Sequence, residues 1–335
     1  MKKILCLGEA LFRLTTPTGS KIENFGDLKL LVGGAELNVA VNLAQFGLPT
    51  AFATKIPNNE LGKIVTRTLA QYGVEHSRVI LGTEMERLGT YYVESGASMR
   101  AGNVVYDRAY SSMSLMSEVE WDLDTLLADV DILHITGITA AISDKWREHI
   151  VEIIECAHQK GIKVSFDMNF RSKLWTSLEA KKTYQQILPY VNYLSANILD
   201  AIHFMDIYLD ENADLEKYIK SIADKYSNLE YIYGTIRHSV TPNQYDYKGF
   251  LYDARTTVMV KSSEYQIRDV IDRIGAGDSY TAGVLAGIAQ NSSDQEIVDF
   301  ATASSVLNHS YLSDYNLFNA NEVHSFMKNS GNIVR

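Results

Sequence analysis

The chain has 335 residues, of which 46% are hydrophobic and 21% are charged, a composition typical of a globular protein with a sizeable core. Its formal net charge of −10 argues against a nucleic-acid partner or an anionic membrane surface, so any anionic ligand has to be held by local arginines or backbone amides. With no apolar run long enough for a membrane span and no signal-peptide pattern at the start, we expect a soluble cytoplasmic protein.

Short apolar runs alternate with helical segments along the chain. Strands are expected at residues 4–8, 51–56, 132–137, 163–167, 193–197 and 231–235. Helices are expected at residues 35–46, 59–72, 145–160, 178–188 and 215–226. This alternation predicts an α/β fold with a mainly parallel sheet and helices on both of its faces.

Polar residues follow three of the expected strands. They are Asp167 with Asn169, Asn197 and Thr235. Ligands of parallel sheets bind beyond the carboxyl ends of the strands. We therefore expect these residues to share one rim of a binding site.

Two segments depart from the strand–helix rhythm and alternate with period two. They are residues 11–32 and 86–111, which we interpret as a small β-lid over the site. The remaining segments, residues 1–10, 33–85 and 112–335, then form the α/β domain that binds nucleotide and substrate. The alternative is a pair of surface hairpins without a function.

The segment Asp272-Arg-Ile-Gly-Ala-Gly-Asp278 precedes an apolar helical run. Gly275 and Gly277 allow a tight turn that exposes successive N–H groups, and the following helix adds the positive end of its dipole. Such a loop suits an anion hole. Asp278 would then be placed to accept a proton from a hydroxyl group. The alternative is an ordinary loop that ends in a helix-capping aspartate.

Two motifs near opposite ends of the chain together resemble the ribokinase-like sugar kinases, the PfkB family. They are Val32–Ala40, which reads VGGAELNVA, and Asp272–Asp278. The resemblance extends over essentially the whole chain. It implies a three-layer α/β sandwich with a small β-lid, ATP as a substrate and Mg²⁺ as a cofactor.

Three further segments resemble one branch of that family, the 2-keto-3-deoxygluconate kinases. They are Gly8–Thr15, Tyr106–Arg108 and Asp167–Arg171 with Leu174-Trp175 behind it. The resemblance implies ATP-dependent phosphorylation of that keto acid to its 6-phosphate. The sequence leaves open whether the gluconate-derived or the galactonate-derived epimer is preferred.

The catalytic residues follow from the same resemblance. Asp278 would deprotonate the sugar hydroxyl that attacks the γ-phosphate of ATP, while Gly275, Ala276 and Gly277 form the anion hole. Phosphoryl transfer depends on such alignment and charge stabilisation. Arg273 stands where the family usually carries threonine, and it either contacts phosphate or lies on the surface.

The resemblance assigns the substrate site to residues from the first motif, the lid and the rim. They are Gly33, Gly34, Glu36, Asn38, Tyr91, Tyr106, Arg108, Asn169, Arg171 and Asp314. The two glycines would let the substrate approach the backbone closely. Arg108 and Arg171 would bind a substrate carboxylate bidentately and should reach toward Asp278. The alternatives are a solvated surface charge for either arginine, a helix cap for Asn38 and a surface position for Asp314.

The nucleotide site is the least regular part of the resemblance. Asn197 with Asp200 resembles the family's Asn-x-x-Glu motif, and its shorter acid would act on Mg²⁺ through water. In place of the usual Gly-x-x-Gly loop, Thr235 and Arg237 would contact nucleotide phosphates together with Gly275 and Gly277. Asn308 would border the adenine.

Two other functions stay open. One is a kinase of a neutral sugar, similar to fructokinase or ribokinase, for which two arginines facing the pocket would have no purpose. The other is a non-catalytic sugar- or nucleotide-binding regulator, favoured by the altered nucleotide motifs. We further expect a homo-oligomer that pairs through the lid.

Overall fold

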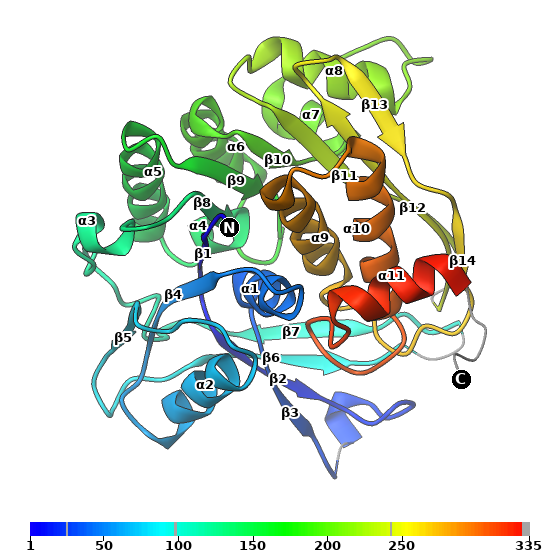
Figure 1. The fold of residues 1–335 in the computed structure, drawn as a ribbon. Coiled ribbons are helices and arrows are strands. Elements are labelled where there is room, and N and C mark those ends of the chain that lie inside the picture. Colours follow the sequence, from blue (N-terminus) through cyan, green and yellow to red (C-terminus); the bar gives the residue numbers. More distant parts are fainter. Residues whose placement is uncertain (25, 97–98, 242, 330–335) are drawn as a thin grey trace.

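The computed structural model describes residues 1–24, 26–96, 99–241 and 243–329. In this part of the chain a ten-stranded sheet runs in the order β13-β12-β11-β10-β9-β8-β1-β4-β5, and β14 pairs with β12 (Figure 1). Its strands are β1 (Ile4–Leu7), β4 (Thr50–Ile56), β5 (Val79–Leu81), β8 (Ile132–Thr136), β9 (Lys163–Asp167), β10 (Tyr193–Ser195), β11 (Tyr231–Thr241), β12 (Gln244–Asp253), β13 (Val258–Lys261) and β14 (Tyr265–Ile267).

Seven neighbouring strands of this sheet run parallel to one another, in the order β5-β4-β1-β8-β9-β10-β11. Every residue of β1, β4 and β8 is buried, which is typical of parallel strands covered on both faces. Two core clusters lie on the two sides of the sheet. The predicted three-layer α/β architecture is therefore confirmed.

Helices form the two outer layers. The helices are α1 (Ala35–Gln45), α2 (Glu60–Gln71), α3 (Leu123–Leu126), α4 (Gly137–Ala140), α5 (Asp144–Gln159), α6 (Ser177–Ile187), α7 (Ile198–Met205), α8 (Leu215–Lys225), α9 (Ala276–Gln290), α10 (Asp294–Asn308) and α11 (Ala320–Asn329). One face is covered by the group from α5 to α8, and the other by α1, α2 and α9 to α11 (Figure 1). None of the described helices is long and apolar enough to cross a membrane.

The β11 strand is longer than the sequence predicts. It was expected to end at Thr235, but it continues to Thr241 and pairs antiparallel with β12 along its whole length. The predicted end is wrong because residues 237–240 are exposed, and a solvated antiparallel hairpin has no buried apolar run to mark it. The hairpin carries Arg237 to the edge of the site.

The segments that break the strand–helix rhythm form a second sheet, which we call the small sheet. It consists of β2 (Leu11–Thr15), β3 (Lys29–Gly33), β6 (Gly89–Glu94) and β7 (Asn103–Asp107) in the order β3-β2-β6-β7. Leu11, Tyr91 and Val93 on its inner face pack with Ile274 of the loop before α9. The small sheet therefore lies against the glycine loop.

Candidate active site

A cavity of about 1080 Å³ opens between the small sheet and the carboxyl ends of the parallel strands. A second cavity of about 510 Å³ adjoins it, and both are lined by Asp167, Asn169 and Arg171. The second cavity also contains Asn197 and Thr235. All four residues of the predicted rim therefore line the second cavity, and Asp167 and Asn169 line the large cavity as well.

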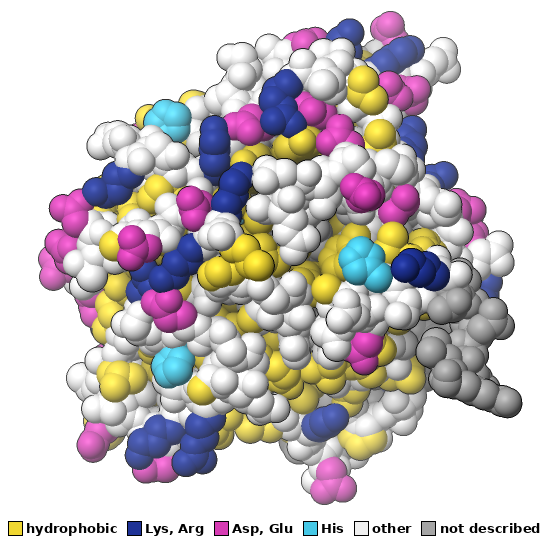
Figure 2. Space-filling model, viewed as in Figure 1, with side chains coloured by type: hydrophobic (Ala, Val, Ile, Leu, Met, Phe, Trp, Pro, Cys, Tyr) yellow, Lys and Arg dark blue, Asp and Glu magenta, His cyan; other side chains and the backbone are white. Residues whose placement is uncertain are grey.

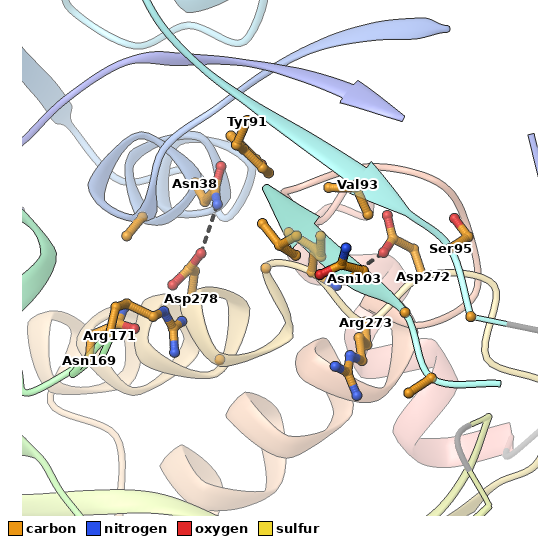
Figure 3. Close-up of a pocket in the computed structure, with 18 of the residues that line it drawn as sticks. Asn38, Tyr91, Val93, Ser95, Asn103, Asn169, Arg171, Asp272, Arg273 and Asp278 are labelled. Carbon is orange, nitrogen blue, oxygen red and sulfur yellow. Dashed lines mark hydrogen bonds between the residues drawn. The ribbon is translucent and has the colours of Figure 1, made fainter. Parts of the chain in front are cut away.

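Asp278 lies in the first turn of α9 and lines the large cavity. Its carboxylate accepts a hydrogen bond of 2.7 Å from Asn38 Nδ2, as Figure 3 shows. Burial raises the pKa of Asp278 to about 8, and the charge of Asp167 adds to this, whereas the Asn38 bond and the charge of Arg171 oppose it. A carboxyl group with this pKa suits a general base near neutral pH.

The glycine loop before α9 has the geometry of an anion hole. Gly275 is the N-cap of α9 with φ +78°, and a side chain there would collide with the backbone oxygen of Asp314. A Cβ at Gly277 would meet nothing within 4 Å. The first N–H groups of a helix have no intrahelical partner, so those of Ala276, Gly277 and Asp278 are available for an anion.

Asn38 reaches Asp278 from α1, a helix that begins near the same point. Gly34 is the N-cap of α1, so Asn38 is not a helix cap and that alternative is wrong. Its Oδ1 is buried and has no hydrogen-bond partner among the described residues. Since buried acceptors are nearly always paired, this oxygen suits a ligand hydroxyl group.

The two glycines before α1 are required by the protein itself. A Cβ on Gly33 would meet the Asp314 carboxylate at 2.1 Å, and one on Gly34, with φ +142°, would meet the Glu9 carbonyl oxygen at 2.3 Å. We expected the substrate to approach the backbone at these glycines. Instead, Asp314 lies against Gly33, and the backbone of Glu9 lies against Gly34. Gly34 still lines the large cavity.

Glu36 lines the cavity but is committed to the core. Its Oε1 accepts hydrogen bonds from Thr136 N at 2.9 Å, Thr136 Oγ1 at 2.7 Å and Thr139 Oγ1 at 2.6 Å. Burial raises the pKa of this carboxyl group. Glu36 therefore holds the first turn of α1 against the end of β8.

Arg108 lies at the junction of the small sheet with the rest of the chain and is only 8% exposed. Its Nε donates to Glu9 at 2.8 Å, and Ser111 bonds the same carboxylate. Arg108 lines the large cavity, so the solvated alternative is wrong. Glu9 orients it and neutralises part of its charge.

The tyrosines of the small sheet divide between two tasks. The Tyr91 hydroxyl donates to the Asp314 carboxylate, and both side chains are buried. Tyr106, opposite Tyr91 across the β6–β7 pair, also lines the large cavity. Asp314, with 1% exposure, faces Tyr91 and Arg13, so its surface alternative is wrong. It is not among the residues that line either described cavity, and its contact with substrate stays a prediction.

Arg171 lies on the rim, exposed to both cavities and without an ion pair among the described residues. The turn before it is held by Asp167, whose Oδ1 accepts from Asn169 N at 3.0 Å while Asn169 adopts φ +37°. Burial raises the pKa of Asp167 to about 6, against the lowering effect of Arg171. Figure 3 shows Arg171 beside Asp278. Arg108 and Arg171 thus line the same cavity as Asp278, and Arg108 donates there to Glu9, so the binding of a substrate carboxylate by both stays a prediction.

Asn197 and Asp200 form a capping box at the start of α7. Asn197 Oδ1 accepts from Leu199 N at 2.8 Å, and Asp200 Oδ2 accepts from Asn197 N at 2.9 Å. Burial raises the pKa of Asp200 to about 7. Both residues line the second cavity, so the other carboxylate oxygen of Asp200 is available there.

The remaining candidates lie around the glycine loop. Arg237 and Arg273 line the large cavity, and Figure 3 shows Arg273 pointing away from the pair of Asn38 and Asp278. Asn308 is fully buried behind the loop, where its Nδ2 donates to Ile274 O at 2.9 Å. It holds the loop that precedes α9 and is not among the residues that line either described cavity, so its place beside the adenine stays a prediction.

Sequence reasoning missed a buried ion cluster that joins the small sheet to the glycine loop. Arg13 Nη1 in β2 donates to Asp272 at 2.5 Å and to Asp314 at 2.7 Å, and Arg13 is fully buried. Asp272 also accepts from Ile274 N. The one available signal was an arginine at a strand position whose neighbours are apolar.

Comparisons with known proteins agree with this geometry. The model of the pfkB family carbohydrate kinases matches residues 1–232 and 250–319. The 2-dehydro-3-deoxygalactonokinase of Haloferax volcanii is 28% identical over 97% of this chain and 96% of its own length.

Solved structures are similar over the whole chain. A PfkB family carbohydrate kinase from Listeria grayi is 41% identical with a TM-score of 0.93, covering 98% of this chain and 100% of that one. A 2-dehydro-3-deoxygluconokinase from Thermotoga maritima is 31% identical with a TM-score of 0.92 over the same shares. The family match spans the chain except for residues 233–249 and the C-terminal end, and this chain therefore belongs to the pfkB family of carbohydrate kinases.

Proposed function

We propose that this chain is an ATP-dependent kinase that phosphorylates 2-keto-3-deoxygluconate, also called 2-dehydro-3-deoxygluconate, on its 6-hydroxyl group. The observation that carries this proposal is the placement of Arg108 and Arg171 in one cavity with Asp278. A neutral sugar gives no reason for a guanidinium such as that of Arg171, which has no ion pair among the described residues, whereas a keto acid carries a carboxylate that Arg171 can bind, with Arg108 held in the same cavity by Glu9. The names of the Thermotoga maritima and Haloferax volcanii relatives support the same class of substrate.

The reaction is an in-line transfer of the γ-phosphoryl group. The sugar 6-oxygen attacks phosphorus, its proton passes to Asp278, and the bond from phosphorus to the ADP oxygen breaks. The N–H groups of Ala276, Gly277 and Asp278 stabilise the charge on the transferring group. Asn38 holds the Asp278 carboxylate through the 2.7 Å hydrogen bond.

Mg²⁺ is the cofactor of this chemistry, and it neutralises charge on the nucleotide phosphates when bound. Among the described residues no cluster of three or more acidic, histidine or cysteine side chains suits a metal ion. This fits an ion carried mainly by phosphate and water. Asp200 would contact it through water, from the carboxylate oxygen that the capping box leaves free. Thr235 lies in the same cavity and would contact the phosphates.

The small sheet acts as a lid in this proposal, with residues 11–32 and 86–111 as its subdomain. Its inner residues Tyr106 and Arg108 face the cavity, while Leu30 and Val105 are exposed to 43% and 45%. We further propose a homo-oligomer that pairs through the lid. Light scattering of the purified protein would measure that state.

No nucleic-acid partner is part of the proposal. Figure 2 shows acidic and basic side chains interspersed over the described residues of the face in view. A chain with a net charge of −10 and such a face repels polyanions.

A coupled assay of ATP consumption tests the function directly. We expect turnover with 2-keto-3-deoxygluconate or its galactonate epimer, and little with fructose or ribose. Asp278→Asn should lower kcat at least about a hundredfold because the base is lost. Arg171→Ala should raise KM for the keto acid about tenfold or more.

Three results would overturn parts of this proposal. Equal turnover of fructose or ribose would contradict the acid-sugar assignment. An unchanged KM for the keto acid in Arg171→Ala would do the same. Absence of ATP consumption with every sugar would favour the non-catalytic regulator.

A further inference from the structure

Arg13 is a fully buried arginine that uses few of its hydrogen-bond donors. It lies in β2 of the small sheet, opposite Tyr91 of β6, and is 0% exposed. Among the described residues only its Nη1 forms hydrogen bonds, whereas Nε and Nη2 are buried without a partner. A buried ion cluster is often no more stable than apolar side chains of similar volume, and unpaired buried N–H groups add to its cost. Stability alone is therefore a weak reason for an arginine at this position.

The first partner of Arg13 is Asp272, which shapes the turn that leads into the glycine loop. Asp272 Oδ2 accepts from Arg13 Nη1 at 2.5 Å, and Asp272 Oδ1 accepts from Ile274 N at 3.1 Å. Gly275, the N-cap of α9, follows Ile274 directly. Asp272 lines the large cavity, where Figure 3 shows it near the strand that carries Val93. Through Asp272, Arg13 fixes the residue that precedes the anion hole.

The second partner of Arg13 is Asp314, which packs against the glycine loop itself. The Asp314 carboxylate accepts from Arg13 Nη1 at 2.7 Å and from the Tyr91 hydroxyl. The Asp314 backbone oxygen lies against Gly275, where an added Cβ would be only 1.7 Å away from it. One guanidinium nitrogen thus holds both the approach to the loop and the segment packed on its first glycine.

The end of α10 holds the glycine loop independently of Arg13. Asn308 Nδ2 donates to Ile274 O at 2.9 Å, and Ile271 N donates to His309 O at 2.9 Å. Neither of these contacts involves the small sheet. The attachment of the loop to the small sheet through ion pairs therefore depends on Arg13.

We propose that Arg13 is a positioning residue for phosphoryl transfer, which fixes the glycine loop so that the first N–H groups of α9 face the transferring group. A misplacement of about 1 Å in a catalytic site can cost on the order of a hundredfold in rate. Arg13 lines neither described cavity, so it acts through Asp272 and Asp314 rather than by touching a ligand. The inference rests on the proposed function, because it assumes that the anion hole receives a phosphoryl group.

Three variants separate positioning from stability. Arg13→Met removes the guanidinium. Arg13→Lys keeps one charged nitrogen, which is the number that the native ion pairs use. Arg13→Met combined with Asp272→Asn also removes one of the two carboxylates left without a cation. We expect kcat for the keto acid to fall at least about tenfold in Arg13→Met and to recover in part in Arg13→Lys. The double variant should regain melting temperature but not kcat.

A binding measurement checks the same effect without turnover. Aluminium fluoride with ADP imitates the transferring phosphoryl group, and transition-state analogues depend on the alignment that Arg13 is proposed to maintain. Titration calorimetry of Arg13→Met should therefore show binding of this complex weakened about as much as kcat falls, and binding of ADP alone nearly unchanged.

Arg255→Met is the matched control. Arg255 pairs with the buried Asp253 at 2.9 Å and lines neither described cavity. Asp253 lies opposite Tyr231, the first residue of β11, so this pair is at the other edge of the sheet. The control also leaves a buried carboxylate without its cation and should melt at a lower temperature, yet it should keep the kcat of the wild type. Thermal melts define a temperature at which every variant is folded.

Several results would overturn the positioning role. They are an unchanged kcat in folded Arg13→Met, an equal fall of kcat in Arg255→Met, and a double variant that regains kcat together with its melting temperature. If Arg13→Met does not fold, Arg13→Lys and the double variant carry the test. If the wild type turned over only a neutral sugar, the acid-sugar function would fail, while kcat for that sugar would still test Arg13.

Discussion

Asp278 has a pKa that depends on two oppositely charged neighbours. Burial and Asp167 raise its pKa, to about 8, while Arg171 and the Asn38 hydrogen bond lower it. A base acts only when it is deprotonated, so kcat/KM should rise with pH and level off above about pH 8. Initial rates measured across this range check the prediction.

Substitutions of the two charged neighbours, made one at a time, should move the rising part of the pH profile of kcat/KM in opposite directions. Arg171→Gln removes a cation and should shift it to higher pH, whereas Asp167→Asn removes an anion and should shift it to lower pH. Each shift should be on the order of half a pH unit or more, because both charges act on the Asp278 carboxylate. Parallel shifts, or none, would mean that Asp278 is not the group that titrates.

At the residue scale, the sequence predicts which residues carry the chemistry better than it predicts which side chains contact one another. Asp278 and Gly277 follow from a local motif, because a glycine turn before a helix exposes N–H groups wherever it occurs. The partners of Arg13 and Asp314 do not follow, because each pairs with residues far away in the chain. The close approach of the Asp314 side chain to Gly33 cannot be predicted from the sequence for the same reason.

The start of α9 makes different demands on its two glycines. Gly277→Ala adds a methyl group in open space, where nothing lies within 4 Å, and alanine favours a helix by about 1 kcal/mol over glycine. This variant should keep or raise the melting temperature, yet lower kcat tenfold or more because the methyl group intrudes on the anion hole.

Gly275→Ala is the matched comparison. Its Cβ would meet the Asp314 carbonyl oxygen at 1.7 Å, and φ is +78°, so the loop has to move and the protein should lose about 2 kcal/mol or more. Thermal melts and initial rates of both variants separate stability from catalysis. Equal loss of stability in the two would contradict this account.

At the element scale, helices whose first turn has a side-chain cap begin close to their predicted positions. Thr176 and Glu179 form a capping box before α6, and Ser143 caps α5, so local sequence defines both starts. β11 differs because its outer half is stabilised by β12 rather than by burial. A strand that is stabilised mainly by pairing with its neighbour has only a weak strand pattern in its own sequence.

Across the whole molecule, the small sheet is joined to the α/β layers by the Arg13 cluster. Arg13→Met would leave Asp272 and Asp314 buried without their cation and should destabilise the protein by about 3–5 kcal/mol. Adding Asp272→Asn and Asp314→Asn to this variant should restore part of the loss, because no unpaired charge remains. Denaturant midpoints measure both effects. A triple variant no more stable than Arg13→Met would contradict the cluster's electrostatic role.

The layers of the molecule follow from the alternation of strands and helices, which the sequence shows throughout. The strand order does not, since nothing local in β1 indicates that β4 and β8 are its neighbours. The packing of the small sheet on the glycine loop also depends on contacts between distant segments. These are the features that create the cavity.

The Arg13 cluster also has a consequence for the order in which contacts form during synthesis. The two carboxylates that neutralise Arg13 lie 259 and 301 residues further along the chain. A ribosome making this protein therefore releases the β2 strand long before either partner exists, and contacts of such separation form late. The ion pairs that join the small sheet to the glycine loop should therefore be complete only after synthesis has passed Asp314.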